Sequence, residues 1–97
     1  MTDHARLVSL CLEYLNWVPQ TFAWPTHDAK HRPCEMGVTD ISCCHRGKHY
    51  AIEIKSGRDK MDGMQDEFGR RVVQALGVHV VVDNLDQLMH CIPENKK

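Results

Sequence analysis

The chain has 97 residues, of which 42% are hydrophobic and 26% are charged. This length fits one domain, expected to span residues 1–97, and the composition is that of a globular protein rather than a disordered or fibrous one. The formal net charge of −1, with seven histidines counted as neutral, excludes a uniformly basic protein, so a nucleic-acid partner would have to meet one local face. A chain this short buries only roughly 60–65% of its unfolded surface, so dimerisation would be a natural way to add buried area.

The sequence shows neither a signal peptide nor a membrane span. The N-terminus opens directly into an amphipathic pattern, and no apolar run approaches the roughly 20 residues that cross a bilayer. We therefore expect a cytoplasmic protein with no membrane partner. The five cysteines cannot all pair within the chain, and in a reducing compartment they are expected to be free thiols.

The first element is predicted to be a helix from Asp3 to about Trp17, capped by Thr2 or Asp3 and ended by Pro19. A short strand, residues 21–24, and a polar loop, residues 26–36, follow. The helix is predicted from apolar residues at helical spacing, namely Leu7, Val8, Cys11, Leu12, Leu15 and Val18.

The next two elements are predicted to be strands joined as a hairpin. The first runs from Val38 to about Cys44, and residues 45–48, which include Gly47, form the turn. The second strand alternates strictly, so one set of side chains faces the core and the other faces a surface that the core does not need. The core set is Tyr50, Ile52 and Ile54, and the other set is Ala51, Glu53 and Lys55.

After a loop at residues 56–60, a helix is predicted from Asp62 to about Leu76, where Gly77 stops it. Its apolar side is expected to carry Met61, Gln65, Phe68, Val72, Ala75 and Leu76. Residues 78–82 are almost wholly apolar, which is typical of a strand covered on both faces. Asn84 and Gln87 form a capping box for a last helix, which Pro93 closes.

The predicted order is helix, strand, strand, strand, helix, strand, helix. The second helix connects the strand that ends near Lys55 to the strand at residues 78–82. It acts as a crossover, which makes those two strands parallel. We therefore predict an α/β fold with a mixed sheet flanked by helices.

Three residues on the hairpin suit phosphodiester chemistry. Glu53 and Lys55 leave the same face of their strand, and Asp40 is expected to lie across the hairpin from Glu53. Two carboxylates bind a divalent cation such as Mg²⁺ or Mn²⁺ through oxygen, and the Ile54 carbonyl between the two side chains is a candidate backbone ligand. The cation would activate a bound water, and the ammonium would orient that water or stabilise charge on the phosphate.

An acid followed by E-x-K occurs often by chance, and the plain alternative is an exposed ion pair on a strand. The surrounding residues favour a functional site. The segments 37–41 (GVTDI) and 52–55 (IEIK), Gln65, and Gly77 before a valine-rich strand resemble the virus-type replication-repair nuclease domain, VRR-NUC, of the PD-(D/E)xK nuclease superfamily. The resemblance runs over nearly the whole chain.

The resemblance implies a restriction-endonuclease-like fold, catalytic roles for Asp40, Glu53 and Lys55, and an Mg²⁺ or Mn²⁺ cofactor. It also implies that Gln65 is the family's motif glutamine, although Gln65 equally fits a capping box with Asp62. Small stand-alone members are typically encoded by phages, which implies the host cytoplasm as the location. They look like homodimers and are linked to cleavage of branched DNA.

Two positions depart from the family's pattern. Thr39 stands where the family usually has proline, which we expect to be tolerated because the proline is not a ligand. The family often carries a glutamate early in its first helix, where this chain has Asp3 and His4. Asp3, His4 and Glu13, the helix's glutamate, remain alternative contributors to the site.

Clusters of basic side chains are candidate DNA contacts. The plain alternative is that they are ordinary solvated surface charges. The first candidates are Lys30, His31, Arg32, Arg58 and Lys60, and further clusters are Arg46 with Lys48 and His49, and Arg70 with Arg71. Trp17, Phe22 and Trp24 are predicted to lie in the core or a dimer interface rather than to stack on bases. The histidines and cysteines between residues 27 and 49 do not form the usual zinc spacings, although His45 and His49 are four apart.

The sequence therefore predicts a metal-dependent DNA endonuclease acting on branched or junction DNA in replication, repair or recombination. The alternatives are a non-catalytic DNA-binding module that retains the fold, against which the intact acids and lysine argue, and a small metal-stabilised interaction protein, against which the zinc spacing argues. No base-reading motif indicates a preferred DNA sequence.

Overall fold

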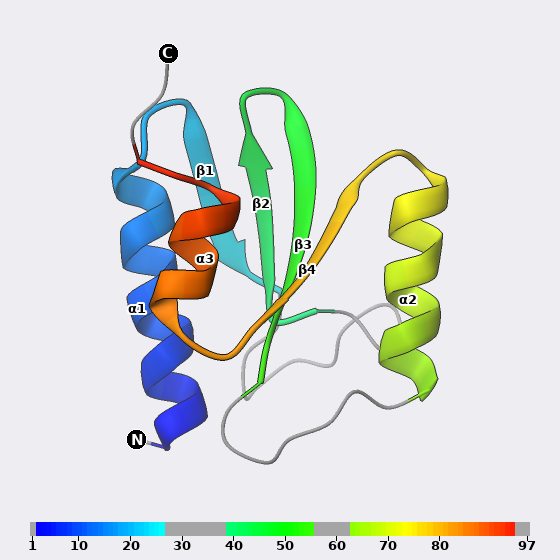
Figure 1. Cartoon of the computed structure of the whole chain (residues 1–97), viewed down its shortest axis with the longest axis horizontal. Coiled ribbons are helices and arrows are strands. Elements are labelled where there is room, and N and C mark those ends of the chain that lie inside the picture. The colour runs from blue at the N-terminus through cyan, green and yellow to red at the C-terminus, as the bar shows by residue number, and fades with distance from the viewer. Residues whose placement is uncertain (1, 27–38, 56–62, 95–97) are drawn as a thin grey trace.

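The computed structural model describes residues 2–26, 39–55 and 63–94. The predicted order of elements and the α/β class are confirmed: three helices flank a mixed sheet of four strands (Figure 1). The elements are α1 (Asp3–Trp17), β1 (Thr21–Pro25), β2 (Ile41–His45), β3 (Lys48–Ile54), α2 (Gly63–Gln74), β4 (Val78–Val82) and α3 (Leu85–Cys91).

The sheet has the strand order β1-β2-β3-β4. β1, β2 and β3 are antiparallel neighbours, and β3 and β4 run parallel, as the crossover through α2 requires. In the β2–β3 hairpin Ile41 pairs with Ile52, and in the parallel pair Glu53 lies beside Val81. This register brings the residue before β2 next to the carboxyl end of β3.

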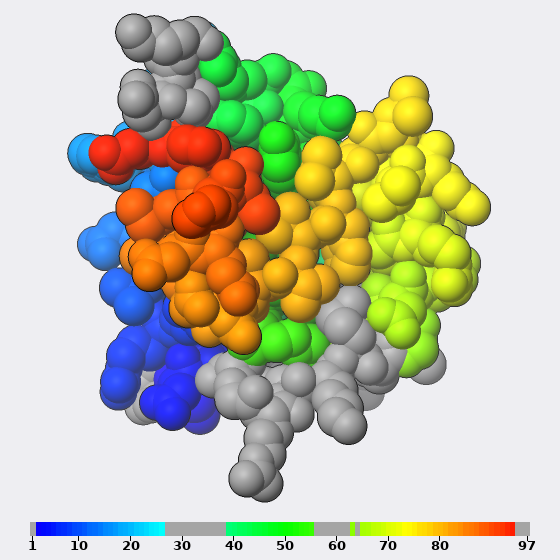
Figure 2. Space-filling view, viewed as in Figure 1, coloured from blue at the N-terminus to red at the C-terminus, as the bar shows by residue number. Residues whose placement is uncertain are grey.

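One face of the sheet, here called the core face, packs against α1 and α3. Cys11 and Leu15 of α1 and Leu88 of α3 are buried in the same cluster as Ile52 and Ile54 of β3. The Tyr14 hydroxyl donates to the Ile92 carbonyl at 2.6 Å and links the two helices, which lie together toward the viewer in Figure 2. The predicted inward set of β3 is therefore confirmed.

The opposite face, here called the α2 face, carries the alternate side chains. α2 packs on β4 at this face: a Cβ built on Gly69 would lie 2.3 Å from Nδ1 of His79, so only glycine lets helix and strand approach this closely. The α2 face consists of Phe22, Trp24, Ser42, Cys44, His49, Ala51, Glu53, Lys55, His79 and Val81.

The N-terminal ends of α1 and α3 agree with the capping predictions, whereas the left-handed residue that ends α2 is Leu76 and not Gly77. Thr2 Oγ1 accepts from Ala5 N at 3.0 Å and caps α1. Asn84 Oδ1 accepts from Gln87 N at 2.9 Å to cap α3, while the Gln87 side chain reaches back to Asp83 N at 2.7 Å. Asp62, the predicted cap of α2, lies outside the described residues.

Three predictions about elements are wrong in part. β2 begins at Ile41, because Thr39 and Asp40 form the bend that leads into it. α2 ends at Gln74, and Leu76, predicted to be on its apolar side, has a φ of 72° and is 82% exposed. Val81 is 45% exposed, so β4 is not covered along its whole length on both faces. Among the described residues, no helix has the length and apolar character to cross a membrane.

Candidate active site

Asp40 is held in place by hydrogen bonds on both sides of the bend before β2. The backbone N–H of Thr26 donates to the Asp40 carbonyl at 3.0 Å, and the Thr26 hydroxyl donates to the carbonyl of Thr39. Thr39 is fully buried, and its hydroxyl donates to the Ile41 carbonyl at 3.3 Å. Hydrogen bonds thus hold Thr39, the residue before the aspartate, in place. The resembled family usually has proline at this position.

The Asp40 carboxylate points across the hairpin to the end of β3. Its Oδ2 accepts from the backbone N–H of Ile54 at 2.9 Å and lies 3.3 Å from Nε2 of His4 on α1. The N–H and C=O of one residue point to the same side of an extended strand, so the Ile54 carbonyl is directed to the side of β3 on which Asp40 lies. Of the alternatives on the first helix, His4 is the one that contacts Asp40.

Glu53, Lys55 and Gln65 form a closed triangle on the α2 face. Gln65 Nε2 donates to Glu53 Oε2 at 2.8 Å, and Lys55 Nζ donates to Gln65 Oε1 at 2.9 Å. Lys55 Nζ also lies 3.3 Å from Glu53 Oε2. Because the first turn of α2 carries Gln65, docking of α2 on β4 positions the amide between the acid and the amine.

Glu53 is buried, with only 3% of its surface exposed, although the sequence predicted a face that the core did not need. Burial is the largest cause that raises its pKa from 4.5 to about 7, and the nearby Asp40 carboxylate raises it further, while Lys55 lowers it. Two carboxylates that lie this close repel each other when both are ionised. A bound cation would therefore reduce the repulsion between the Glu53 and Asp40 carboxylates.

The oxygen donors fit a divalent metal ion of the Mg²⁺ type. Glu53 Oε2 is occupied by Gln65 and Lys55, but Oε1 is buried and has no hydrogen-bond partner. An orphaned carboxylate oxygen normally costs free energy unless a cation or donor meets it. Among the described side chains no group of three metal-binding residues occurs, and Mg²⁺ is commonly held by one or two carboxylates, with waters and substrate oxygens completing its shell.

Several predicted contacts lie elsewhere or cannot be described. Lys30, His31, Arg32, Arg58 and Lys60 lie outside the described residues. Trp17, Phe22 and Trp24 are 67%, 64% and 39% exposed, so the core position predicted for them is wrong, while the alternative of a dimer interface stays a prediction. Asp3, the second alternative on the first helix, is an exposed residue in the first turn of α1.

The histidines at the β2–β3 turn do not come together. His45 lies on the core face, 8% exposed, with Nδ1 2.7 Å from the Thr21 hydroxyl, whereas His49 is exposed on the α2 face. The two rings therefore do not share a zinc ion. Arg46, Lys48 and His49 are exposed at this end of the sheet, far along the strands from Asp40.

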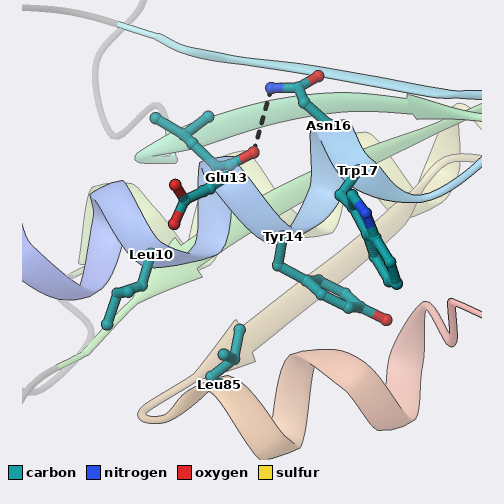
Figure 3. Close-up of a pocket in the computed structure, with 7 residues that line it drawn as sticks. Leu10, Glu13, Tyr14, Asn16, Trp17 and Leu85 are labelled. Atoms are coloured by element: carbon teal, nitrogen blue, oxygen red, sulfur yellow. Dashed lines mark hydrogen bonds between the residues drawn. The ribbon is translucent and has the colours of Figure 1, made fainter.

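A separate open hollow lies between α1 and the start of α3 (Figure 3). Leu10, Trp17 and Leu85 contribute apolar side chains, and the Tyr14 ring lies between α1 and α3. A second hollow borders the site itself and is lined by His4, Pro25, Asp40 and the neighbouring turns of α1. The Asp40 edge is thus open to a ligand, whereas the Glu53 side chain is buried.

No family model matches this chain, and the comparisons with curated proteins and with solved structures find no match either.

Proposed function

We propose that this chain is a divalent-metal-dependent nuclease, a hydrolase that acts on phosphodiester bonds. The observation that carries the proposal is the convergence of Asp40, Glu53 and Lys55 at one end of β2 and β3, with Glu53 Oε1 buried and unpartnered. A binding module has no evident need for a buried acid whose pKa is raised to about 7, whereas perturbed acids are typical of catalytic sites.

Asp40 and Glu53 would hold the cation, with the Ile54 carbonyl as an additional oxygen donor. Bound Mg²⁺ or Mn²⁺ polarises a phosphate and lowers the pKa of a coordinated water. Lys55, fixed by Gln65 at 2.9 Å, would bring its positive charge to the phosphate as negative charge develops there. Gln65 would keep Lys55 and Glu53 in one geometry.

In its finer form the proposal is an endonuclease of the VRR-NUC type, acting on branched or junction DNA in replication, repair or recombination. We further propose a homodimer that works in the cytoplasm. The four described cysteines, Cys11, Cys43, Cys44 and Cys91, carry no disulfide, which agrees with a reducing compartment.

The test is cleavage of supercoiled plasmid and of a four-way junction with Mg²⁺, Mn²⁺ or EDTA. Wild-type protein should cut with either metal and not in EDTA. Glu53→Gln and Asp40→Asn should keep the fold and lose at least about a hundredfold in rate, equivalent to about 2.7 kcal/mol of transition-state stabilisation. Wild-type rates in either purified variant, or binding of DNA with no cleavage by any variant or metal, would reject the nuclease and favour a DNA-binding module.

A further inference from the structure

An exposed aromatic pair lies on the same sheet face as Glu53 and Lys55. Phe22 and Trp24 alternate with the buried Ala23 on β1, so both project from the α2 face. Their ring centroids are 5.3 Å apart at an interplanar angle of 31°. Two large aromatic side chains left in solvent forgo a substantial burial energy.

The register places the pair on a path that leads away from the candidate active site. Trp24 lies beside Ser42, which lies beside Ala51, and Glu53 is the next residue along β3 on this face. Trp24 is thus about 10 Å across two strand spacings and about 7 Å along the strand from Glu53. Phe22 is two residues further from the site, level with Cys44 and His49.

Charge at the far end of this path suits a polyanion. Residues 41–52 contain no acid, and neither do residues 14–26. Beyond Phe22, the β2–β3 turn carries the exposed Arg46, whose Nε donates to Gln20 Oε1 at 3.2 Å, while Lys48 pairs with His45 on the core face. The path therefore runs from the acidic site, across two aromatic rings, to the exposed Arg46.

We propose that Phe22 and Trp24 stack on unpaired bases of a DNA strand whose backbone reaches the Asp40 and Glu53 site. This inference rests on the proposed nuclease function and names its substrate class: DNA with unpaired nucleotides beside the cut. Exposed aromatic rings bind single strands in this manner, since every base has a stacking face. In a continuous duplex the bases are stacked on one another and would not reach the rings. A second copy of the chain on this face would cover the path to Glu53, so DNA is the occupant that agrees with a working site.

The test is binding of oligothymidylate in EDTA, where no cleavage occurs. With Trp17→Phe as the background, Trp24 is the remaining tryptophan, and its fluorescence should be quenched by the oligonucleotide. Trp24→Leu keeps an apolar side chain but has no ring, and it should bind roughly tenfold more weakly or worse. Trp24→Phe should bind within about threefold of wild type, because a ring is retained. Trp17→Leu removes the more exposed tryptophan, which lies on α1, and should leave binding unchanged.

An abasic oligonucleotide of the same length separates stacking from phosphate binding, and wild type should bind it as weakly as Trp24→Leu binds oligothymidylate. The inference is overturned if Trp24→Leu binds like wild type, if the abasic strand binds as tightly as the normal one, or if the substitution changes the mass of the assembly, which would identify this face as an interface between copies. A protein that binds and quenches but never cuts would reject the nuclease and keep the stacking site.

Discussion

Glu53 is the residue at which folding and function conflict most directly. Its carboxyl group is buried, lies near Asp40, and has one oxygen with no partner. Gln65 donates a hydrogen bond to the other oxygen and Lys55 forms an ion pair with it. These contacts offset part of the cost of burying an acid. An isosteric neutral residue at this position should therefore stabilise the metal-free protein while removing the proposed activity, which is the usual exchange between stability and function at active sites.

The pH dependence of unfolding tests this conflict. The pKa of Glu53 is about 7 in the folded chain against 4.5 without the fold, so the folded state binds more protons between these values. Stability from this group is present below about pH 4.5 and is lost as the pH rises through 7. In EDTA, Glu53→Gln should lie within about 1 kcal/mol of wild type at pH 5, where the unfolded carboxyl is partly ionised, and exceed it at pH 8.5 by on the order of 2–3 kcal/mol. Urea unfolding of both proteins across this range measures the difference, and parallel stability curves would contradict it.

Lys55 should act on turnover rather than on affinity. Its ammonium is held by Gln65 and Glu53, so it is oriented toward the site and not extended into solvent. Lys55→Ala should slow cleavage at saturating DNA by roughly a hundredfold or more while the dissociation constant changes by less than about threefold.

Arg70→Ala is the matched control for Lys55, since it removes an exposed cation whose recorded partner is Glu67 on the same helix. It should leave turnover unchanged, because its partner is Glu67 and not a residue of the site, and any contact of Arg70 with DNA would alter affinity alone. If Lys55→Ala instead weakens binding and spares turnover, Lys55 is a phosphate clamp.

At the residue scale, the sequence was sufficient to predict the side-chain positions that strand and hairpin geometry determine. Alternation on β3 predicted that Glu53 and Lys55 share a face, and the hairpin predicted that Asp40 lies nearby. It could not predict that Glu53 is buried, because its cover depends on where α2 docks. It also left Asp3, His4 and Glu13 open, since contact of His4 with Asp40 depends on how α1 crosses the sheet.

At the scale of elements, the docking of α2 controls the site. Gly69 faces the His79 ring across the contact between α2 and β4, and a Cβ there would lie 2.3–2.8 Å from three ring atoms. Gly63, at the start of the same helix, has nothing within 4 Å of its built Cβ. Substitutions at the two glycines therefore distinguish the effect of close packing on stability from the effect of helix propensity.

Gly69→Ala should destabilise the protein by about 1–3 kcal/mol, because overpacking outweighs the roughly 1 kcal/mol that alanine adds to helix propensity. Gly63→Ala should be neutral or stabilising by up to about 1 kcal/mol. Thermal and urea unfolding measure both variants. Combining Gly69→Ala with His79→Ala should restore much of the loss; if it does not, the His79 ring is not the obstacle.

Element order followed from periodicity, and the parallel β3–β4 pair followed from the crossover rule. The ends of elements were less predictable for local reasons. Asp40 was predicted inside a strand, but it forms a bend before β2, where its carbonyl accepts from the Thr26 N–H. Leu76 was predicted on the apolar side of α2, but its left-handed backbone turns it into solvent. Tertiary hydrogen bonds and chain reversals decide such positions, and a hydrophobic pattern does not contain them.

At the scale of the whole molecule, two regions of the described chain expose large aromatic side chains. One is the aromatic pair on the α2 face. The other is the outer side of α1, where Leu10 is 45% and Trp17 is 67% exposed beside the hollow of Figure 3. The two regions lie on opposite faces of the sheet, so DNA on one does not exclude a protein contact on the other.

The outer side of α1 is the surface on which we predict a homodimer. A 97-residue chain has a marginal core, and a twofold contact would bury Leu10 and Trp17 of both copies. Light scattering at micromolar concentration should give about twice the 11.2 kDa of one chain. Leu10→Glu should convert the dimer to a monomer by introducing a charge into the contact, and Phe22→Ala, on the other face, should not change the mass. A wild-type mass near 11.2 kDa that DNA leaves unchanged would remove the dimer and any paired cutting by two linked sites, while each chain would still carry its own Asp40, Glu53 and Lys55.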